Sequence, residues 1–212
     1  MADEKYVAAI EISSSKVLAV VGKYNSMTGE LDVIAAEQEK GLESVKYGLI
    51  RNVEEVWMRI ARLIQRLESK PAVAPRKITG VFVGLSGVSL RSIAVPVSIN
   101  LGDDIEITDE ILDRLFTQTR TSAIDSSLEV VDAVPRVYKV GQQETLSPKG
   151  IIGSSISAEF DLIVCRKEMK RNIMRVFEDK LKTQLKMRGL VVTALATGQV
   201  VLTDEEKRLG CM

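Results

Sequence analysis

The segment Tyr6–Lys23, YVAAIEISSSKVLAVVGK, decides the fold class of this chain. Two runs rich in valine, isoleucine and alanine, Tyr6–Ile12 and Lys16–Lys23, are separated by three consecutive serines. Residues of these types favour strands, and a short polar run between two strands favours a tight connection. We therefore predict a β-hairpin whose turn is the serine triplet 13–15.

The residues after this hairpin predict a third strand and a helix that packs on the sheet. A turn at Asn25–Gly29 leads to a strand at Leu31–Glu37, and Lys40–Arg51 is a short connection. Asn52 has the features of a helix N-cap, supported by Glu55 three residues later. The apolar residues that follow recur at helical spacing and form one stripe: Val53, Val56, Trp57, Ile60, Leu63, Ile64 and Leu67.

A change of pattern begins after the next predicted strand, Lys77–Leu85. Pro71 and Pro75 end the helix before this strand. Alternating apolar residues at positions 93–101 then predict a half-buried strand, in which Pro96 favours a sheet edge or bulge. Thr108 is predicted to cap a short helix. Two further strands complete a small α+β module, and we place them at Leu128–Val140 and Ser154–Cys165.

The last part of the chain returns to an α/β pattern. Lys167–Met187 is predicted to form a long helix with Gly189 as its C′ residue, followed by a strand at Leu190–Ala196. The sequence TDEE at 203–206 matches a capping box and predicts a last short helix that Gly210 ends.

The order of these elements predicts an α/β protein with an insertion. A three-stranded start followed by αβαβ is the layout of an RNase H-like layer, the half-domain of actin-like ATPases. Residues 1–85 and 166–212 would form this layer as one discontinuous subdomain. Residues 86–165 would form an inserted α+β subdomain.

The composition excludes several classes of function. The 212 residues are 45% hydrophobic and 27% charged, which is ordinary for a globular protein with a core. Because 29 basic and 29 acidic residues balance, no global charge indicates nucleic acid as a partner. Histidine is absent, which excludes Ser-His-Asp catalysis and imidazole zinc sites. Cys165 and Cys211 show no metal-ligand spacing and predict no disulfide framework.

We expect the chain to be cytoplasmic. Its acidic, strand-like start differs from a secretory signal, and no apolar run reaches the ~18 residues of a membrane span. The segment 166–188 is rich in lysine and arginine. An anionic-membrane or nucleic-acid surface is one interpretation of that segment, but its inward apolar stripe favours a solvated helix face.

The serine turn is the first candidate site. A hairpin turn that presents backbone N–H groups, hydroxyls and a lysine can hold a phosphate. A carboxylate at the end of the preceding strand can support Mg²⁺ through water. The candidate residues are Glu11, Ser13, Ser14, Ser15 and Lys16, with Glu11 as the metal-supporting group. A polar surface turn is the alternative interpretation of the same spacing.

Five segments resemble, in order, motifs of the FtsA family of actin-like cell-division proteins. AIEISSSKV at 9–17 resembles the first phosphate loop, and KYGLIRN at 46–52 is similar to the segment before the first helix. Actin and Hsp70 insert a subdomain before that helix, whereas FtsA carries its SHS2 subdomain where the module stands here. The other three matching segments are Val81–Gly87, Val134–Tyr138 and Leu195–Lys207.

The resemblance implies an assembly protein rather than an enzyme. FtsA polymerises and links the tubulin-like FtsZ ring to the membrane, with at most slow ATP hydrolysis. A full-length protein of this kind would bind ATP and Mg²⁺ and would associate with the membrane at the division site. FtsZ and membrane contacts would lie in regions beyond these residues. The inserted subdomain would mediate self-association and contacts with other division proteins, and no nucleic acid is implied.

Two departures from the family pattern predict weak nucleotide binding. Glu11 stands where the family has aspartate, and Mg²⁺ tolerates a displaced carboxylate poorly. Ser13 stands where the family has glycine, which would cost ~1–2 kcal/mol if that position required a positive φ. The second phosphate loop of the family would follow Met212. We therefore expect these residues alone to bind no ATP measurably.

Two other functions remain open at this point. PilM-like pilus-assembly proteins share the position of the inserted subdomain. ATP-dependent sugar or acetate kinases of the same superfamily would instead carry substrate-binding Asp or Arg side chains in a deep pocket.

Overall fold

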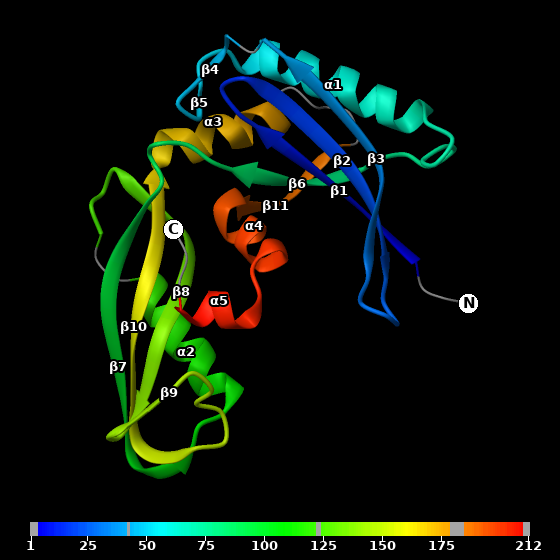
Figure 1. Cartoon of the computed structure of the whole chain (residues 1–212). Coiled ribbons are helices and arrows are strands. Elements are labelled where there is room, and N and C mark those ends of the chain that lie inside the picture. Colours follow the sequence, from blue (N-terminus) through cyan, green and yellow to red (C-terminus); the bar gives the residue numbers. More distant parts are fainter. Residues whose placement is uncertain (1–3, 42, 122–123, 179–184, 210–212) are drawn as a thin grey trace. The chain divides into compact units, whose positions relative to one another are not determined.

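The computed structural model describes residues 4–41, 43–121, 124–178 and 185–209, and the chain divides into two compact units (Figure 1). The first unit comprises Met1–Val88 and Glu168–Met212, and the second comprises Ser89–Lys167. These divisions lie close to the boundaries at 85/86 and 165/166 that the sequence predicts.

A five-stranded mixed sheet forms the centre of the first unit. Its strands are β1 (Glu4–Ile12), β2 (Lys16–Asn25), β3 (Leu31–Lys40), β6 (Gly80–Leu85) and β11 (Lys186–Val192), in the order β11-β6-β1-β2-β3. The first three strands are antiparallel, whereas β6 runs parallel to both β1 and β11. The predicted hairpin is confirmed, because β1 and β2 pair up to Ile12 and Val17, on either side of the serine triplet.

The helix α1 (Val53–Ser69) packs against β2 and β3 as its apolar stripe predicts. Val56, Ile60, Leu63 and Leu67 are fully buried. The predicted N-cap is also confirmed, since Asn52 Oδ1 accepts the Glu55 N–H at 3.1 Å. This bond satisfies one of the free donors at the helix start.

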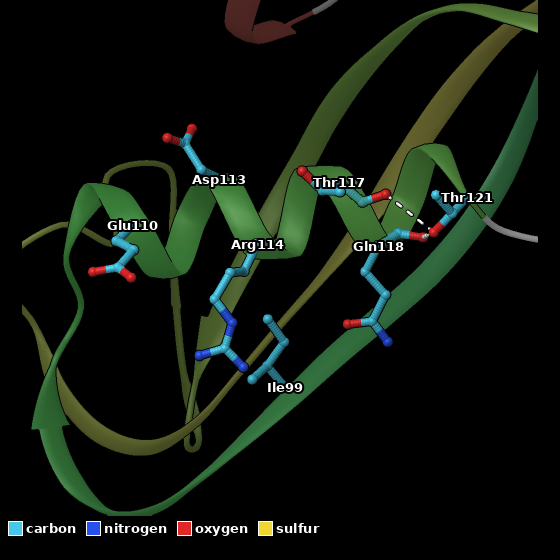
Figure 2. A pocket seen from close by; sticks show the side chains of 7 residues that line it. All are labelled: Ile99, Glu110, Asp113, Arg114, Thr117, Gln118 and Thr121. Carbon is cyan, nitrogen blue, oxygen red and sulfur yellow. Dashed lines mark hydrogen bonds between the residues drawn. The ribbon is translucent and has the colours of Figure 1, made fainter.

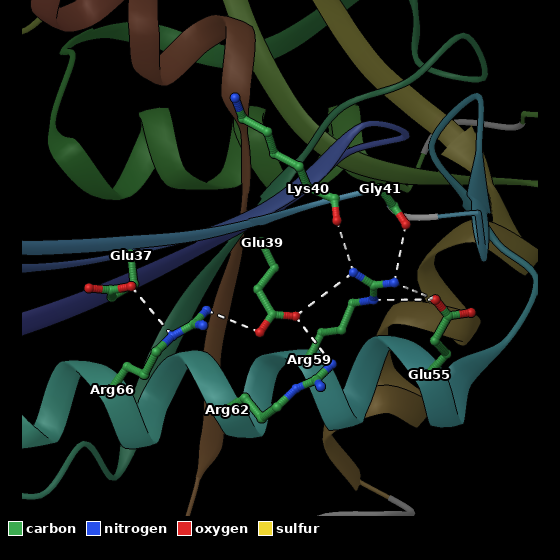
Figure 3. A network of polar contacts seen from close by, with 8 residues as sticks. All are labelled: Glu37, Glu39, Lys40, Gly41, Glu55, Arg59, Arg62 and Arg66. Carbon is green, nitrogen blue, oxygen red and sulfur yellow. Dashed lines mark hydrogen bonds and ion pairs between the residues drawn. The ribbon is translucent and has the colours of Figure 1, made fainter.

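Charged side chains fasten α1 to the end of β3 (Figure 3). Glu39 accepts a hydrogen bond from Arg62 at 3.3 Å and one from Arg66 at 3.0 Å. Arg59 donates to the carbonyl oxygens of Lys40 and Gly41, at 3.0 and 3.1 Å. Exposed ion pairs contribute little singly, but the carbonyl bonds fix the point where the chain leaves β3.

A small hairpin interrupts the segment 40–51, for which the sequence predicts only a plain connection. It consists of β4 (Val45–Lys46) and β5 (Leu49–Ile50), and its turn residues have φ values of 55° at Tyr47 and 82° at Gly48. Two positive φ values match the turns that suit the twist of paired strands. Asn172 Nδ2 donates to the Ile50 carbonyl at 3.0 Å and holds the hairpin to α3 (Lys167–Glu178).

The turn of this hairpin touches the backbone beyond β6. A Cβ atom on Gly48 would lie 2.4 Å from the Ser86 carbonyl oxygen and 2.9 Å from the Gly87 Cα. A Cβ atom on Gly87, whose φ is 139°, would lie 2.7 Å from the Tyr47 carbonyl oxygen. Both glycines are therefore required by close backbone approach as well as by φ.

The second unit is a four-stranded antiparallel sheet with one helix on it. Its strands are β7 (Arg91–Glu106), β8 (Leu128–Val140), β9 (Gln143–Thr145) and β10 (Ile152–Arg166), in the order β7-β10-β8-β9, and its helix is α2 (Asp109–Arg120). Phe160 lies at the centre of the core, edge-to-face with Phe116 and Tyr138 at centroid distances of 6.1 and 6.3 Å. Thr108 occupies the predicted N-cap position, but its side chain forms no capping hydrogen bond.

The prediction for residues 167–196 is partly wrong. The helix α3 ends at Glu178 in the described residues, and Met187 lies in β11, paired with Val81 of β6. Gly189 is a strand residue beside a register irregularity, not a C′ residue. The predicted strand end at Ala196 belongs instead to α4 (Thr193–Val201). Residues of β11 form a strand because they pair with β6, and the spacing of apolar residues along the sequence does not indicate this pairing.

The last described helix, α5 (Asp204–Leu209), begins with the predicted capping box. The Glu206 N–H donates to Thr203 Oγ1 at 3.3 Å, and the Thr203 N–H donates to Glu206 Oε2 at 2.8 Å. This reciprocal pair confirms the sequence pattern. Gly210, proposed to end the helix, lies outside the described residues.

We predict that Gly48→Ala destabilises the chain more than a glycine change in open space does. The substitution combines an unfavourable φ with a backbone collision, so we expect a loss of about 2–4 kcal/mol in the free energy of unfolding. Gly29→Ala is the matched control, because Gly29 has a φ of 74° but a Cβ atom there would meet nothing within 4 Å. Its loss should be about 1 kcal/mol. Urea unfolding measures both, and equal losses would contradict the backbone contact.

A polar cluster lies across three strands of the second unit. Arg136 donates to both carboxylate oxygens of Asp161 at 2.7 and 2.9 Å, and to Glu159 at 2.8 Å. Ser92 Oγ donates to Asp161 at 2.6 Å. The hydrogen bonds from Arg136, aided by Ser92, hold the pKa of Asp161 below its ordinary value.

We predict that this cluster makes stability depend on acidic pH. Because the folded-state pKa of Asp161 is lowered, its contribution is present above the unfolded pKa of about 4 and is lost as pH falls through the folded pKa. Asp161→Asn should therefore flatten the fall in urea midpoint between about pH 5 and pH 2. Asp104→Asn, which changes an exposed carboxylate on β7, should leave the fall as steep as in the unmodified chain.

Candidate functional site

The predicted phosphate loop forms a tight turn at the end of β1. The Ser13 N–H donates to the Lys16 carbonyl at 2.9 Å, and Ser13 Oγ donates to the same carbonyl at 3.0 Å. Ser14 and Ser15 are exposed at the tip, and their N–H groups donate to no acceptor among the described residues. The Gly41 N–H donates to the Ser15 carbonyl at 3.0 Å, which ties the turn to the end of β3. The turn therefore presents two outward N–H groups to an anion.

Backbone strain at Ser13 does not occur in this structure. Among the described non-glycine residues, only Tyr47 has a positive φ. The expected cost of ~1–2 kcal/mol depends on a positive φ at position 13, so that cost does not apply here. The Ser13 N–H, however, is used inside the turn and does not face outward.

Glu11 meets two residues from other strands where the parallel strands end. It pairs in register with Gly84 of β6. A Cβ atom on Gly84 would lie 2.8 Å from Thr193 Oγ1 and 3.6 Å from Cβ and Cγ of Glu11. Glycine at 84 therefore lets the carboxylate-bearing side chain and the hydroxyl approach each other over bare backbone. The carboxyl ends of parallel strands are the usual place for a ligand in α/β folds.

A cleft of about 250 Å³ opens beside these three residues. Its floor is apolar and comes from one face of the sheet, on which Ala9 and Val20 are half-buried and Phe82 and Val191 are exposed. The Thr193 hydroxyl oxygen is buried and has no hydrogen-bond partner among the described residues. A buried hydroxyl without a partner costs free energy, so a ligand that accepts its hydrogen bond would be favoured there.

A magnesium site built from protein carboxylates alone is not present in the described part of the chain. No group of three or more Asp, Glu, His or Cys side chains converges there. Glu11 provides one carboxylate near the turn. This donor set fits the predicted support of Mg²⁺ through water, because Mg²⁺ keeps several waters when phosphate groups and one or two carboxylates bind it.

Sequence reasoning missed two residues of this site. Gly84 appears in the sequence only as part of an apolar segment, and Thr193 falls in a stretch predicted to be a strand. A glycine within a buried strand is a signal of close approach, so Gly84 could have been found. Thr193 could not, because its position depends on β11 ending at Val192.

The second unit matches a known domain family. Residues 87–164 match the family model described as the SHS2 domain inserted in FTSA. The cell division protein FtsA of Escherichia coli (strain K12) is 27% identical over 213 residues, covering 98% of this chain and 48% of that protein. The chain therefore resembles FtsA over almost its whole length. FtsA of Porphyromonas gingivalis is also 27% identical, covering 96% of this chain and 42% of that protein.

This FtsA-like chain spans about half the length of the curated relatives that it matches. Among solved structures, the PilM-PilN type IV pilus biogenesis complex matches with a TM-score of 0.57 and 14% identity, over 91% of this chain and 49% of that chain. At this identity the likeness concerns the fold alone. The predicted fold class, an actin-type α/β layer with an inserted SHS2-like α+β subdomain, is confirmed.

We predict that Thr193→Val stabilises the FtsA-like chain. Valine has the shape of threonine without the hydroxyl, so the free energy of unfolding should rise by about 1 kcal/mol when the unpaired buried oxygen is removed. Thr197→Val, on the exposed side of α4, is the matched control and should change stability by less than about 0.5 kcal/mol. A loss of stability in Thr193→Val would show that the hydroxyl has a partner.

Proposed function

We propose that this chain acts in bacterial cell division as an FtsA-like assembly protein. The observation that carries the proposal is the SHS2 match at 87–164, placed between β6 and α3. Between β3 and α1, where actin and Hsp70 would carry their subdomain, the described residues form only the hairpin β4–β5. The similar proteins also support a role in cell division, because both are named cell division protein FtsA.

The nucleotide part of the proposal concerns the turn after β1. ATP with Mg²⁺ would bind the full-length protein, with Ser13, Ser14, Ser15 and Lys16 around the phosphates and Glu11 supporting the metal through water. The outward N–H groups of the turn and the unpaired Thr193 hydroxyl support this placement. We propose regulatory binding and, at most, slow hydrolysis, as the resemblance to FtsA implies.

The two units correspond to different subdomains of the proposed assembly protein. We assign residues 1–85 and 166–212 to subdomain 1A of the actin-like fold, and residues 86–165 to the inserted subdomain 1C. The inserted subdomain would contact neighbouring protomers and other division proteins. FtsZ and the membrane at the division site would be reached through regions outside these 212 residues. No helix in the described part of this chain is long and apolar enough to span a membrane.

A pilus-assembly function is the second candidate, and one observation favours it. The fold resembles that of the PilM-PilN complex with a TM-score of 0.57. The higher sequence identity to FtsA, over almost the whole chain, favours cell division instead. We retain no kinase proposal, because the cleft beside Glu11, Gly84 and Thr193 is lined mainly by apolar side chains and carries neither Asp nor Arg.

Deletion of residues 89–167 in the source organism separates these functions. The cell-division proposal predicts long cells without septa, because the protein loses its assembly contacts. The pilus proposal predicts normal septation and loss of pili. The two ends left by the deletion should be joined by a flexible linker, and immunoblotting should verify that the shortened protein accumulates. Normal cell length at normal protein level would exclude the cell-division function.

A further inference from the structure

The outer edge of the second unit's sheet is formed by a long strand. β7 pairs with β10 on one side, and no described strand pairs with its other side. Its pairing with β10 is continuous from Arg91 to Asn100. A free strand edge exposes a row of N–H and C=O groups that another strand can complete.

The position of Pro96 indicates which residues of β7 direct their backbone N–H and C=O groups away from β10. Proline has no N–H, so regular antiparallel pairing places it where the backbone groups point away from β10. Residues of the same parity share that direction, which gives Ala94, Ser98 and Asn100 outward N–H and C=O groups. Pro96 interrupts this row. It leaves Val97–Asn100 as one usable segment and Arg91–Val95 as another.

The segment 97–100 lies beside a groove. A space of about 450 Å³ runs between β7 and α2, with Ile99 at its floor and Glu110, Arg114, Gln118 and Thr121 along its α2 side. Figure 2 shows Arg114 and Gln118 extending from α2 toward the side on which Ile99 lies, while Asp113 points the other way. The edge of β7 and the helix α2 together border a groove that fits one extended chain.

Arg114 is the cation among the residues that line this groove, and the other charged lining residues are Glu110 and Asp113, of which Asp113 points away from Ile99. Arg114 forms no ion pair or hydrogen bond with any described residue, although Glu110 lies one helical turn before it. A guanidinium with five free donors fits a carboxylate in a bidentate manner. We propose that the β7 edge at 97–100 and the α2 groove bind an extended peptide segment of a partner protein, with an acidic side chain at Arg114.

This inference rests on the proposed function, in which the inserted domain contacts other division proteins. A second copy of the chain is a poorer occupant than a foreign peptide. Edge-to-edge pairing of two β7 strands would be limited by Pro96 on both copies.

The test uses a fluorescein-labelled peptide, Ser-Val-Ser-Asp-Ser-Val-Ser, and the full 212-residue chain in fluorescence anisotropy titrations. Its valines and aspartate share one face of an extended strand, which would lie on Ile99 and Arg114. We expect saturable binding that is about tenfold weaker for Arg114→Ala and for the peptide with Lys in place of Asp. Equal affinity for both peptides would overturn the proposal.

A second pair of variants tests the strand edge itself. Ser98→Pro removes one outward N–H beside the groove and should weaken peptide binding about tenfold. Ala94→Pro removes an outward N–H on the other side of Pro96 and should leave affinity unchanged. Thermal unfolding checks that both variants fold. If Ser98→Pro does not fold, N-methylation of alternate peptide residues removes the same type of hydrogen bond from the ligand instead.

Three results would contradict the edge-strand proposal. One is unchanged binding by Ser98→Pro or by the N-methylated peptide. Another is equal weakening by Ala94→Pro. The third is a concentration-dependent dimer in sedimentation velocity that Ser98→Pro abolishes, because the edge would then belong to a second copy. Septation defects from deleting 89–167, combined with full peptide binding by Arg114→Ala, would defeat this inference and leave the cell-division function standing.

Discussion

The parallel pairing of β6 with both β1 and β11 is the constraint on which the first unit depends. β1 belongs to the N-terminal hairpin, whereas β11 begins only at Lys186, after the inserted domain. The sheet is complete only when segments from both sides of the insertion meet on β6. Closing so long a loop is entropically tolerable if the inserted residues fold independently, since loop-closure cost grows slowly with length. The core of the second unit, centred on Phe160, meets that condition.

Two glycines near the end of β6 allow other parts of the first unit to approach its backbone closely. Gly84 within β6 lets Glu11 and Thr193 approach each other over the sheet. Gly87, just beyond β6, lies against Gly48 of the β4–β5 turn. One glycine serves the candidate nucleotide site, and the other fixes the exit toward the inserted domain. A side chain at either position would push apart elements that the fold brings into contact.

The two units carry different kinds of chemistry. In the first unit, outward N–H groups, one carboxylate and a buried hydroxyl gather where parallel strands end, which suits an anionic ligand. In the second unit, the features proposed for binding are the free edge of β7 and a groove lined by Arg114, Glu110 and Asp113. Main-chain pairing supplies affinity with little demand on sequence, and side-chain pockets supply specificity. These features underlie the proposal that the inserted domain contacts a partner protein.

The sequence by itself determined what depends on neighbours along the chain. The β1–β2 hairpin, the Asn52 cap of α1 and the Thr203–Glu206 capping box are local hydrogen-bond patterns, and the structure contains all three. The place of the insertion and the candidate turn also followed from residue order. How the turn binds a ligand stays a prediction.

Only the tertiary structure decided what depends on distant partners. Residues 186–187 belong to strand β11 because β6 offers a parallel edge, whereas the sequence predicted them as the end of a helix; the strand predicted from Leu190 is confirmed as far as Val192. Thr193 reaches the candidate site because β11 ends where it does. The β4–β5 hairpin is held by Ser86, Gly87 and Asn172, which are remote in sequence. Local propensity contributes only fractions of a kcal/mol per residue, so such contacts override it readily.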